Sequence, residues 1–482
     1  MNQNTVRKGC GIALAAYFVL AVLLFWIGGD QFQYRDEETD MLTASAPIGE
    51  ITKDQVVTQQ ISVSGDELRD LTFAGATYAR QNTGILLFEV LDGEQVIGST
   101  SVDLSTLQDN SEFTVSFSPA ISVSSAEATV RITAPESEPG NAVTLYMGNT
   151  MSASRTEVSV SIAEENCVFV NGSPLAGSLC LSVHSREYLW FGQYYWVFVA
   201  ALFLVLLFTC VFLLYQNKRG KHSRILNLFA AFSRYRFLMK QLVARDFKTK
   251  YKRSVLGVLW SFLNPLLTMA VQYIVFSTLF QSDIPNFPVY LLTGIICFNY
   301  FNEAASMSLT SIVGNAALIT KVYVPKYIYP LTRVMSSTIN FLLSLIPLLL
   351  VLLVTQTPVR ISILLLPFGL ACLFAFSLGI GMLLASAMVF FRDMQFLWGV
   401  LSMIWMYLTP VFYPESIIPE QFVTVYKMNP LYQIIRFFRI ALIDGVSPEP
   451  KAYLLMILAS FIPLLIGAAV FKKTQDRFVL NL

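Results

Sequence analysis

The chain has 482 residues, of which 55% are hydrophobic and only 13% are charged. Soluble domains usually carry about 25% charged residues, so this composition excludes an ordinary soluble protein and indicates a membrane protein. The two histidines lie outside the apolar runs, which argues against a histidine-based catalytic or metal site inside the membrane.

The first long apolar run lies between Lys8 and Asp30. A helix of about 20 apolar residues crosses the bilayer core, and this run is long enough to do so. It follows Arg7 and Lys8 as a signal peptide would, but it is longer than a signal-peptide core and shows no clear cleavage site. We therefore interpret residues 1–29 as a retained transmembrane anchor.

Residues 30–187 differ sharply from the rest, because they contain 23 Asp and Glu against seven Lys and Arg. Short runs in this segment alternate apolar and polar residues, which is typical of half-buried strands. Asp92-Gly93 and Asn171-Gly172 are typical of hairpin turns. These patterns predict an inserted all-β sandwich domain, for which a jelly roll is one candidate.

Two cysteines lie in this polar segment, and they flank the predicted turn at Asn171-Gly172 almost symmetrically. Cys167 and Cys180 would face each other across a hairpin and form a disulfide if the domain lies outside the cytoplasm. Two free thiols are the equal alternative.

A second apolar span is predicted over residues 188–217, and a strongly basic segment follows it. Residues 218–253 hold 12 of the 33 Lys and Arg, and apolar residues recur there at helical spacing. This pattern predicts an amphipathic helix in the inner membrane interface, which serves either as an orientation anchor alone or also as a docking surface. The apolar positions are Ile225, Leu228, Phe229, Phe232, Leu238, Leu242 and Val243.

Six more spans are predicted in residues 254–482, which makes eight in a polytopic α-helical membrane protein. With both termini in the cytoplasm and residues 30–187 outside it, the inner segments would hold 21 of the 33 Lys and Arg, as the positive-inside rule requires. The six spans lie between the charged pairs Arg253/Asp283, Asp283/Lys321, Arg333/Arg360, Arg360/Arg392, Asp393/Glu415 and Lys451/Lys472, and only the second is interrupted, by Glu303.

This half of the chain contains five motifs, in the order Asp246–Phe280, Phe287–Leu331, Phe391–Gly399, Tyr407–Pro419 and Met428–Gly445. Together they resemble the ABC-2 type permeases that export lipid-linked cell-surface polysaccharides, such as O-antigen, and teichoic-acid-like polymers. The resemblance covers roughly residues 223–482. The first 220 residues depart from it, because ordinary members have six spans and no large external domain.

The resemblance implies a homodimer that works with two separate ATPase subunits in the bacterial cytoplasmic membrane. This chain has no G-x-x-x-x-G-K-[ST] loop, since Gly220-Lys221 lacks the earlier glycine and the following Ser or Thr. We therefore expect ATP and Mg²⁺ on the partner, and no catalytic residue, cofactor or metal on this chain. The other expected partners are the lipid-linked glycan and membrane lipids, and no nucleic acid is expected.

The family contacts its ATPase through the cytoplasmic connection after its second span, which corresponds here to Gly314–Pro330. Asn315 is expected to cap a short helix that Pro325 and Pro330 stop from extending. The alternative is an ordinary turn with lysines that obey the positive-inside rule. Arg392 and Asp393, at the next cytoplasmic turn, would pair with each other or with the docking surface. The residues assigned to coupling are Asn315, Leu318, Thr320, Lys321, Arg392 and Asp393.

The last external segment, between Glu415 and Lys451, is too broken to span the membrane. Asn429-Pro430 is a typical helix start, and about 14 residues follow with one apolar face. The resemblance implies a short re-entrant helix that closes the channel exit. Arg436 and Arg439 are expected on its polar face, where they would meet phosphates of lipid or substrate, or simply anchor the helix among headgroups.

Aromatic residues make up 13% of the chain and offer faces over which a sugar chain can slide. The alternative for each of them is helix packing or placement at the membrane interface. Glu303 is costly inside a membrane, so it would either line the pathway or hold helices together. The candidate pathway residues are Trp260, Tyr300, Phe301, Glu303, Trp405, Tyr407 and Phe412.

The sequence thus predicts the transmembrane subunit of a polymer exporter, and two other functions remain open. One is export of drugs or small lipids by the same family, and the other is a receptor that senses glycan through the external domain. A membrane glycosyltransferase or acyltransferase is disfavoured, because the sequence has no DxD-type metal site and no membrane-facing histidine. The external domain would bind sugar or gate the exit, or it would be a structural platform.

Overall fold

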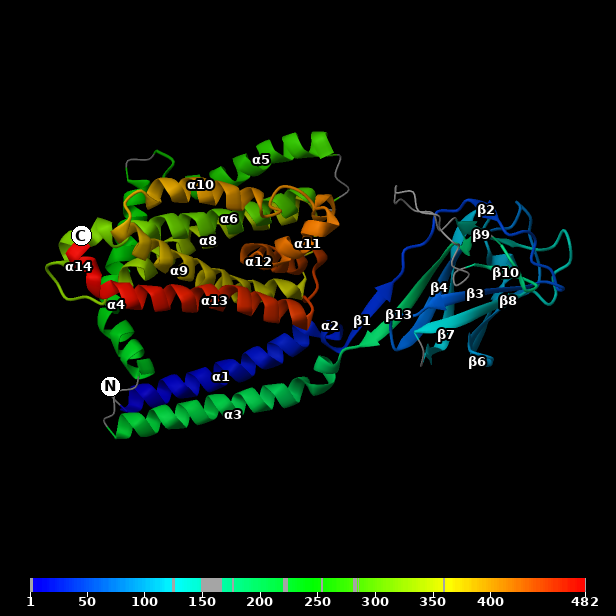
Figure 1. Cartoon of the computed structure of the whole chain (residues 1–482), viewed down its shortest axis with the longest axis horizontal. Helices are drawn as coiled ribbons and strands as arrows, with labels where there is room; N and C mark the ends of the chain where they lie inside the picture. Colours follow the sequence, from blue (N-terminus) through cyan, green and yellow to red (C-terminus); the bar gives the residue numbers. More distant parts are fainter. Residues whose placement is uncertain are drawn as a thin grey trace. The chain divides into compact units, whose positions relative to one another are not determined.

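The computed structural model describes residues 3–123, 126–148, 167–175, 177–219, 224–252, 255–280, 284, 286–358 and 360–481. The chain divides into two compact units, each of which is described by itself. One comprises residues 1–31 and 196–482 and is helical, and the other comprises residues 32–195 and is built of strands (Figure 1).

The β unit contains two antiparallel sheets, which confirms the predicted all-β sandwich. The first runs in the order β1 (Tyr34–Glu38), β13 (Leu181–Tyr188), β4 (Glu67–Ala76), β9 (Thr144–Gly148) and β12 (Ser178–Leu179), with β2 (Ala46–Pro47) on β9 and β7 (Ser111–Ser122) on β4. The second runs in the order β11 (Ser173–Pro174), β10 (Phe169–Val170), β3 (Val56–Ser62), β8 (Glu127–Thr133), β5 (Ile85–Asp92) and β6 (Gln95–Asp103).

The alternation of apolar residues places one face of each sheet in a common core. In β4, Leu68, Leu71 and Phe73 are fully buried, and Phe88 of β5 meets Phe73 with ring centroids 5.1 Å apart. Since every second side chain of a strand points to the same face, the polar residues between these positions lie outside. The core therefore follows the period of two in the sequence, except at a bulge between Leu68 and Asp70, where the buried residues are three apart.

Both predicted hairpins are present, with one shift of register. Asn171 and Gly172 have positive φ of 51° and 77° between the paired residues Val170 and Ser173, as a tight hairpin turn requires. In the other hairpin Asp92 pairs with Gln95, so Gly93 and Glu94 form the turn and Asp92 ends the strand.

The disulfide that the sequence allowed is absent, because Cys167 and Cys180 are both free thiols. The hairpin ends before Cys180: β12, which precedes this cysteine, pairs with β9 and not with β10. The backbone of Cys180 then bonds to Tyr146 at 2.8 Å and to Ala74 at 3.0 Å. Symmetry about the turn therefore did not bring the two thiols together.

The helical unit contains a helix at each of the eight predicted spans. Among the described residues, six are long and apolar enough to cross a membrane. Helix α6 is also 23 residues long but carries Glu303, and α10 has only 14 residues. The helices are α1 (Gln3–Gly28), α3 (Trp190–Lys218), α5 (Trp260–Phe280), α6 (Phe287–Leu309), α8 (Ile328–Val354), α9 (Leu366–Phe390), α10 (Met394–Tyr407) and α13 (Pro450–Thr474).

The basic segment forms the amphipathic helix α4 (Arg224–Tyr251). Its residues Met239 and Leu242 are buried in the core, while Arg236 and Lys240 are exposed. The apolar positions predicted at Ile225, Leu228, Phe229 and Phe232 lie outside the described side chains. Shorter elements complete the chain: α2 (Asp30–Gln33), α7 (Ala316–Ile319), α11 (Glu420–Lys427), α12 (Pro430–Arg439) and α14 (Phe478–Asn481).

Helix α9 lies in the middle of the helical unit and packs against α6, α8, α12 and α13. Gly379 of α9 meets Gly467 of α13 so closely that a Cβ on Gly467 would lie 2.2 Å from the Gly379 carbonyl oxygen. Small residues allow such close backbone approach between membrane helices, where lipid offers apolar groups an equally favourable environment. The two glycines thus fix the distance between α9 and α13.

Candidate functional site

The connection after α6 forms a short helical segment, as the sequence predicted. A 3₁₀ turn at Val313–Asn315 leads into α7, and Thr320 and Lys321 after it are exposed. The predicted cap is wrong, because the Asn315 side chain makes no capping bond and its φ and ψ are −118° and 20°. Its amide nitrogen instead donates to the Ser311 carbonyl at 2.8 Å, and the residue is buried.

The Asn315 amide oxygen is occupied by helix α4, which explains why it cannot act as a cap. Both terminal nitrogens of Arg245 lie 3.4 Å from this oxygen. Arg245 also donates to Asp246 Oδ1 at 3.2 Å, and Arg333 at the start of α8 reaches the same oxygen at 2.9 Å. The Asp246 side chain is only 4% exposed, so this carboxylate is a buried junction between α4 and α8.

One turn further along α4, a second acidic group joins the helices. Lys250 Nζ lies 2.7 Å from Glu303 Oε1, and the same oxygen accepts from Asn340 Nδ2 of α8 at 2.7 Å. The Tyr251 hydroxyl bonds to Asn340 and to Ser261 of α5. Glu303 therefore links α6 to α4 and α8. This is the predicted role in which Glu303 holds helices together.

Two cavities open beside these acidic groups, and both are lined in part by Lys250 and Glu303. The larger, about 690 Å³, is bounded by Arg245, Asp246, Thr249, Lys250, Glu303, Met307, Gly314 and Arg333. The smaller, about 320 Å³, is bounded by Lys250, Tyr251, Trp260, Ser261, Asn264, Pro265, Asn299, Glu303, Asn340 and Ser344. Glu303 thus lines polar space as well as joining helices, and Trp260, which is 46% exposed, faces the same space.

The turn between α9 and α10 contributes Arg392 and Asp393, both of which are exposed. They do not pair with each other among the described ion pairs. Arg392 instead donates to the carbonyl of Asn481 in the C-terminal helix at 3.2 Å. The predicted pair with Asp393 is therefore not formed, and a contact of Arg392 with the docking surface stays a prediction.

The predicted helix start at Asn429-Pro430 is confirmed, because the Asn429 side chain accepts from the Leu431 backbone at 3.1 Å. Trp405 Nε1 donates to the same oxygen at 3.1 Å and ties the start of α12 to α10. A π-helical turn at Ile440–Asp444 extends α12. The predicted apolar face, Leu431, Ile434, Ile435 and Phe438, is fully buried.

The two arginines of this segment do not share a face toward lipid or substrate. Arg436 is exposed as predicted, but Arg439 is 6% exposed and donates to the carbonyls of Pro410 at 2.8 Å and Val411 at 3.0 Å. Its guanidinium lies 3.4 Å from the centre of the Tyr290 ring. The prediction for Arg439 is therefore wrong: it closes the turn before α11 against α6.

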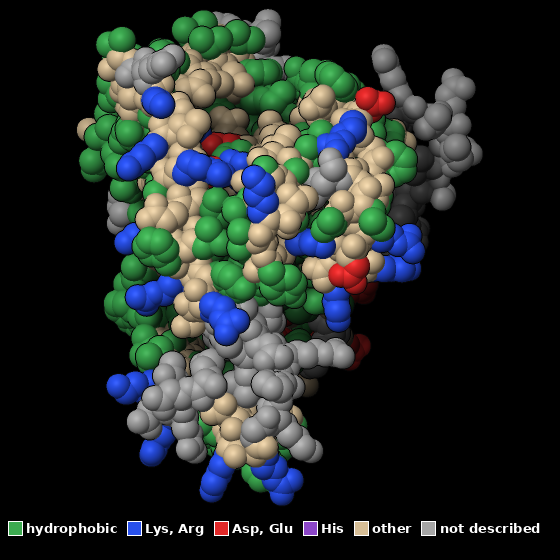
Figure 2. Space-filling model, turned by 90° about the vertical axis from the view of Figure 1, so that its left-hand side faces the viewer, with side chains coloured by type: hydrophobic (Ala, Val, Ile, Leu, Met, Phe, Trp, Pro, Cys, Tyr) green, Lys and Arg blue, Asp and Glu red, His purple; other side chains and the backbone are tan. Residues whose placement is uncertain are grey.

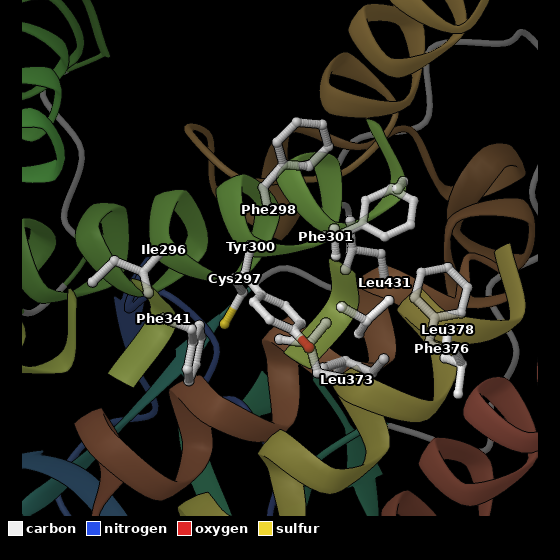
Figure 3. Packing of buried hydrophobic residues seen from close by; sticks show 14 of the residues in the cluster. Ile296, Cys297, Phe298, Tyr300, Phe301, Phe341, Leu373, Phe376, Leu378 and Leu431 are labelled. Carbon is white, nitrogen blue, oxygen red and sulfur yellow. The ribbon is translucent and has the colours of Figure 1, made fainter. Parts of the chain in front are cut away.

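Three of the predicted pathway aromatics lie inside the packed core. Phe301 is fully buried and packs against Phe376 and Trp405 with ring centroids 5.0 and 5.1 Å apart, and Figure 3 shows Phe301 among the side chains of this cluster. Tyr300 is also buried and bonds to Thr338 at 3.0 Å. Phe412 is 6% exposed, whereas Tyr407 is 60% exposed. In this arrangement Tyr300, Phe301 and Phe412 are packing residues of the fold, which is the alternative that the sequence left open for each aromatic.

Comparison with known proteins places this helical core in a family. Residues 238–443 match the ABC-2 type transporter family. The chain is 32% identical over 245 residues to the O-antigen export system permease protein RfbA of Klebsiella pneumoniae, which covers 50% of this chain and 93% of that protein. The chain belongs to the ABC-2 type transporter permeases. It is a membrane transport subunit and not an enzyme.

Two further relatives match the same half of this permease. The RfbA protein of Myxococcus xanthus is 30% identical, covering 51% of this chain and 95% of its own length. The polysialic acid transport protein KpsM of Escherichia coli is 23% identical, covering 50% of this chain and 95% of its own length. The resemblance stated from the motifs is therefore confirmed.

The charged surface of the permease is uneven. Figure 2 shows Lys and Arg side chains gathered on the end of the helical unit near the C-terminus, with few acidic side chains among them. Exposed residues that belong to this end include Lys321, Arg392, Lys472, Lys473 and Arg477. Cytoplasmic loops of membrane proteins carry such an excess of positive charge.

The sequence reasoning missed Asp246 and its partner Arg333, although a signal was present. Asp246 is the only acidic residue among the 12 basic residues of 218–253. An acid in a basic amphipathic helix, four residues before Lys250, lies on the same helical face as that lysine. Arg333, which pairs with Asp246, and Asn315, which bonds to Arg245, are distant in sequence, so only the fold could reveal them.

Proposed function

We propose that this permease exports a lipid-linked cell-surface polysaccharide, or a teichoic-acid-like polymer, across the bacterial cytoplasmic membrane. The observation that carries the proposal is its 32% identity over 93% of a protein named as an O-antigen export permease. The polysialic acid transport protein also matches half of this chain over 95% of its own length. A bulky polar polymer is thus the substrate class that the relatives favour over drugs or small lipids.

The proposed assembly contains two copies of this chain and two ATPase subunits that bind ATP and Mg²⁺. The segment after α7 supports a docked subunit, because Lys321 and the large apolar residues beside it are exposed: Val322 is 50% and Tyr323 is 93% exposed. Exposed apolar side chains next to a lysine at a loop tip favour a protein contact over free solvation. Leu318 lies in α7 and Thr320 directly follows it, and both complete the proposed contact.

Both termini are proposed to be cytoplasmic, and the β unit to lie outside the membrane. The basic end of the helical unit and the acidic composition of residues 30–187 both support this orientation. Outside the membrane, the β unit would either contact the polymer or act as a platform for assembly. Deleting residues 34–187 and joining the flanking spans with a short linker would separate these roles by its effect on polymer binding and on complex assembly.

The test is a deletion of this chain in the cell that makes it, followed by separate analysis of surface and cytoplasmic polymer. Loss of surface polymer with accumulation of lipid-linked polymer inside is the expected result, and re-expression of the wild-type chain restores the surface. Unchanged surface polymer with lower resistance to small toxic compounds would instead favour a drug exporter. Unchanged polymer and unchanged resistance would favour a receptor.

A further inference from the structure

The two carboxylate oxygens of Asp246 have different environments. Oδ1 accepts from Arg245 of its own helix and lies 2.9 Å from Arg333 Nη1. Oδ2 is buried, and no described group donates a hydrogen bond to it. A buried acceptor without a partner costs free energy, so a second arrangement in which an arginine moves to Oδ2 is favourable for that oxygen.

The space needed for such a change is present beside the carboxylate. Arg245, Asp246 and Arg333 all line the cavity of about 690 Å³, and the Arg245 side chain is 49% exposed. Packed interiors otherwise resist continuous deformation, so motion occurs between discrete arrangements of contacts. The two oxygens of the Asp246 carboxylate, next to a cavity lined by both arginines, would allow two such arrangements.

The junction joins three elements, one of which is the proposed ATPase contact. Arg245 holds Asn315 at 3.4 Å, immediately before α7, while Arg333 belongs to the first two turns of α8. A second link lies about three turns earlier on α4, where the Tyr235 hydroxyl donates to the Tyr323 carbonyl at 3.5 Å. Helix α4 therefore contacts the connection on both sides of α7, at Asn315 and at Tyr323, and residues 315–323 are called the coupling segment below.

The same face of α4 continues the connection into the transmembrane helices. Lys250, four residues after Asp246, binds Glu303 of α6, and Glu303 binds Asn340 of α8. Tyr251 reaches Asn340 and Ser261, so α5 is included. Residues at positions i and i+4 share a helical face, which aligns both acidic junctions along one edge of α4.

We propose that Asp246 is a positioning residue that transmits movement of the coupling segment to α8 and the end of α4. It thereby determines how much ATP the complex consumes for each polymer exported. This inference rests on the proposed function. It assigns no contact with substrate to Asp246; the carboxylate acts through Arg245, Arg333 and Asn315.

The test uses the full complex of permease and ATPase in lipid vesicles that contain labelled lipid-linked polymer. ATP hydrolysed per polymer exported is measured for the wild-type chain, Asp246→Asn, Arg333→Gln and the charge swap Asp246→Arg with Arg333→Asp. Coupling between sites usually corresponds to roughly 5- to 150-fold, so we expect Asp246→Asn to raise this ratio about fivefold or more. Asp476→Asn, which removes an exposed acid, is the matched control and should leave the ratio unchanged.

The charge swap distinguishes transmission from simple folding. Partial return of the ratio toward the wild-type value in the swap, with hydrolysis still active in the single variants, would support the inference. An unchanged ratio in Asp246→Asn and Arg333→Gln would overturn it. Should Asp246→Asn fail to assemble, an unchanged ratio in Arg333→Gln overturns it equally. A wild-type complex that hydrolyses ATP but exports no polymer would instead contradict the proposed function.

Discussion

The β unit and the helical unit use acidic residues in different ways. Residues 30–187 carry 23 acidic side chains and residues 188–482 carry nine. In the β unit Asp36 is 61% and Glu89 is 21% exposed, and each pairs with an arginine on the neighbouring strand of its own sheet. In the helical unit Asp246 is 4% and Glu303 27% exposed, and each joins separate helices.

This difference follows from what surrounds each unit. In water, burial of apolar surface stabilises a sandwich at roughly 25 cal/mol per Å², and exposed ion pairs add little. Between membrane helices, lipid is as apolar as leucine, so close packing and polar contacts carry more of the specificity. The loss in the free energy of unfolding should therefore be largest for buried apolar residues in the β unit and for buried polar residues in the helical unit.

The largest expected effect is a truncation in the β core. Phe88→Ala should lower the free energy of unfolding of the β unit by about 4 kcal/mol, because the ring is fully buried against Phe73 and Phe113. Hydrogen exchange of the full chain, read from strands β4 and β5, would measure it. Val96→Ala, at a position 42% exposed, is the control and should change stability by less than about 0.5 kcal/mol.

The second-largest effect is expected in the helical unit, at the buried polar residue Arg439. Arg439→Met keeps much of the side-chain volume but leaves the Pro410 and Val411 carbonyls without their donor, so we expect a loss of about 3 kcal/mol. Unfolding in mixed detergent micelles would measure it. Arg436→Met changes an exposed arginine three residues away and should cost little; equal costs for both variants would show that the buried contacts of Arg439 contribute nothing special.

Glu303 should give a smaller effect that depends on the replacement. Glu303→Ala removes the acceptor for both Lys250 and Asn340, and we expect a loss of about 1 to 2 kcal/mol. Glu303→Gln retains an acceptor and should lose less than about 1 kcal/mol. The same detergent unfolding distinguishes them, and identical losses would refute a role for the hydrogen bond to Asn340.

The smallest effect is expected at the surface of the β unit. Arg186 donates to both oxygens of Asp36, at 2.6 and 2.9 Å, and this hydrogen-bonded pair holds the pKa of the carboxyl below its ordinary value. The pair therefore stabilises the fold above the ordinary pKa of aspartate, and this contribution disappears as pH falls through the lowered pKa.

Because Asp36 is largely exposed, its contribution should be less than about 1 kcal/mol. Hydrogen exchange of strands β1 and β13 at neutral and acidic pH would detect it in the wild-type chain and not in Asp36→Asn. Asp54→Asn, at an exposed position outside the described ion pairs, should keep the wild-type pH dependence. If hydrogen exchange in Asp36→Asn keeps the wild-type dependence on pH, the pair of Asp36 and Arg186 does not stabilise the fold.

Local pattern made much of this architecture predictable. The alternation in β4 and β5, the Asn171-Gly172 turn and the Asn429 cap depend on neighbours in sequence, and all three are present. Errors arose where a distant partner decides. Asn315 bonds to an arginine 70 residues away, and Arg439 to carbonyls 28 and 29 residues away.

Composition likewise located the spans but did not separate core from surface within them. An aromatic side chain in an apolar run has the same local pattern whether it faces a pathway or another helix. Phe301 and Tyr407 were assigned alike from sequence, yet one is fully buried and the other 60% exposed. Only the packing of α6 against α9 and α10 distinguishes them.

Transport in inverted membrane vesicles provides the decisive measurement. Vesicles that contain this permease and its ATPase partner would be given labelled lipid-linked polymer and ATP on their outer, formerly cytoplasmic, face. Protection of the polymer from an added glycan-degrading enzyme should appear only with ATP, and it should be absent with an ATPase variant unable to hydrolyse ATP. Polymer that stays fully degradable, while the same vesicles take up a small drug or lipid with ATP, would contradict polymer export.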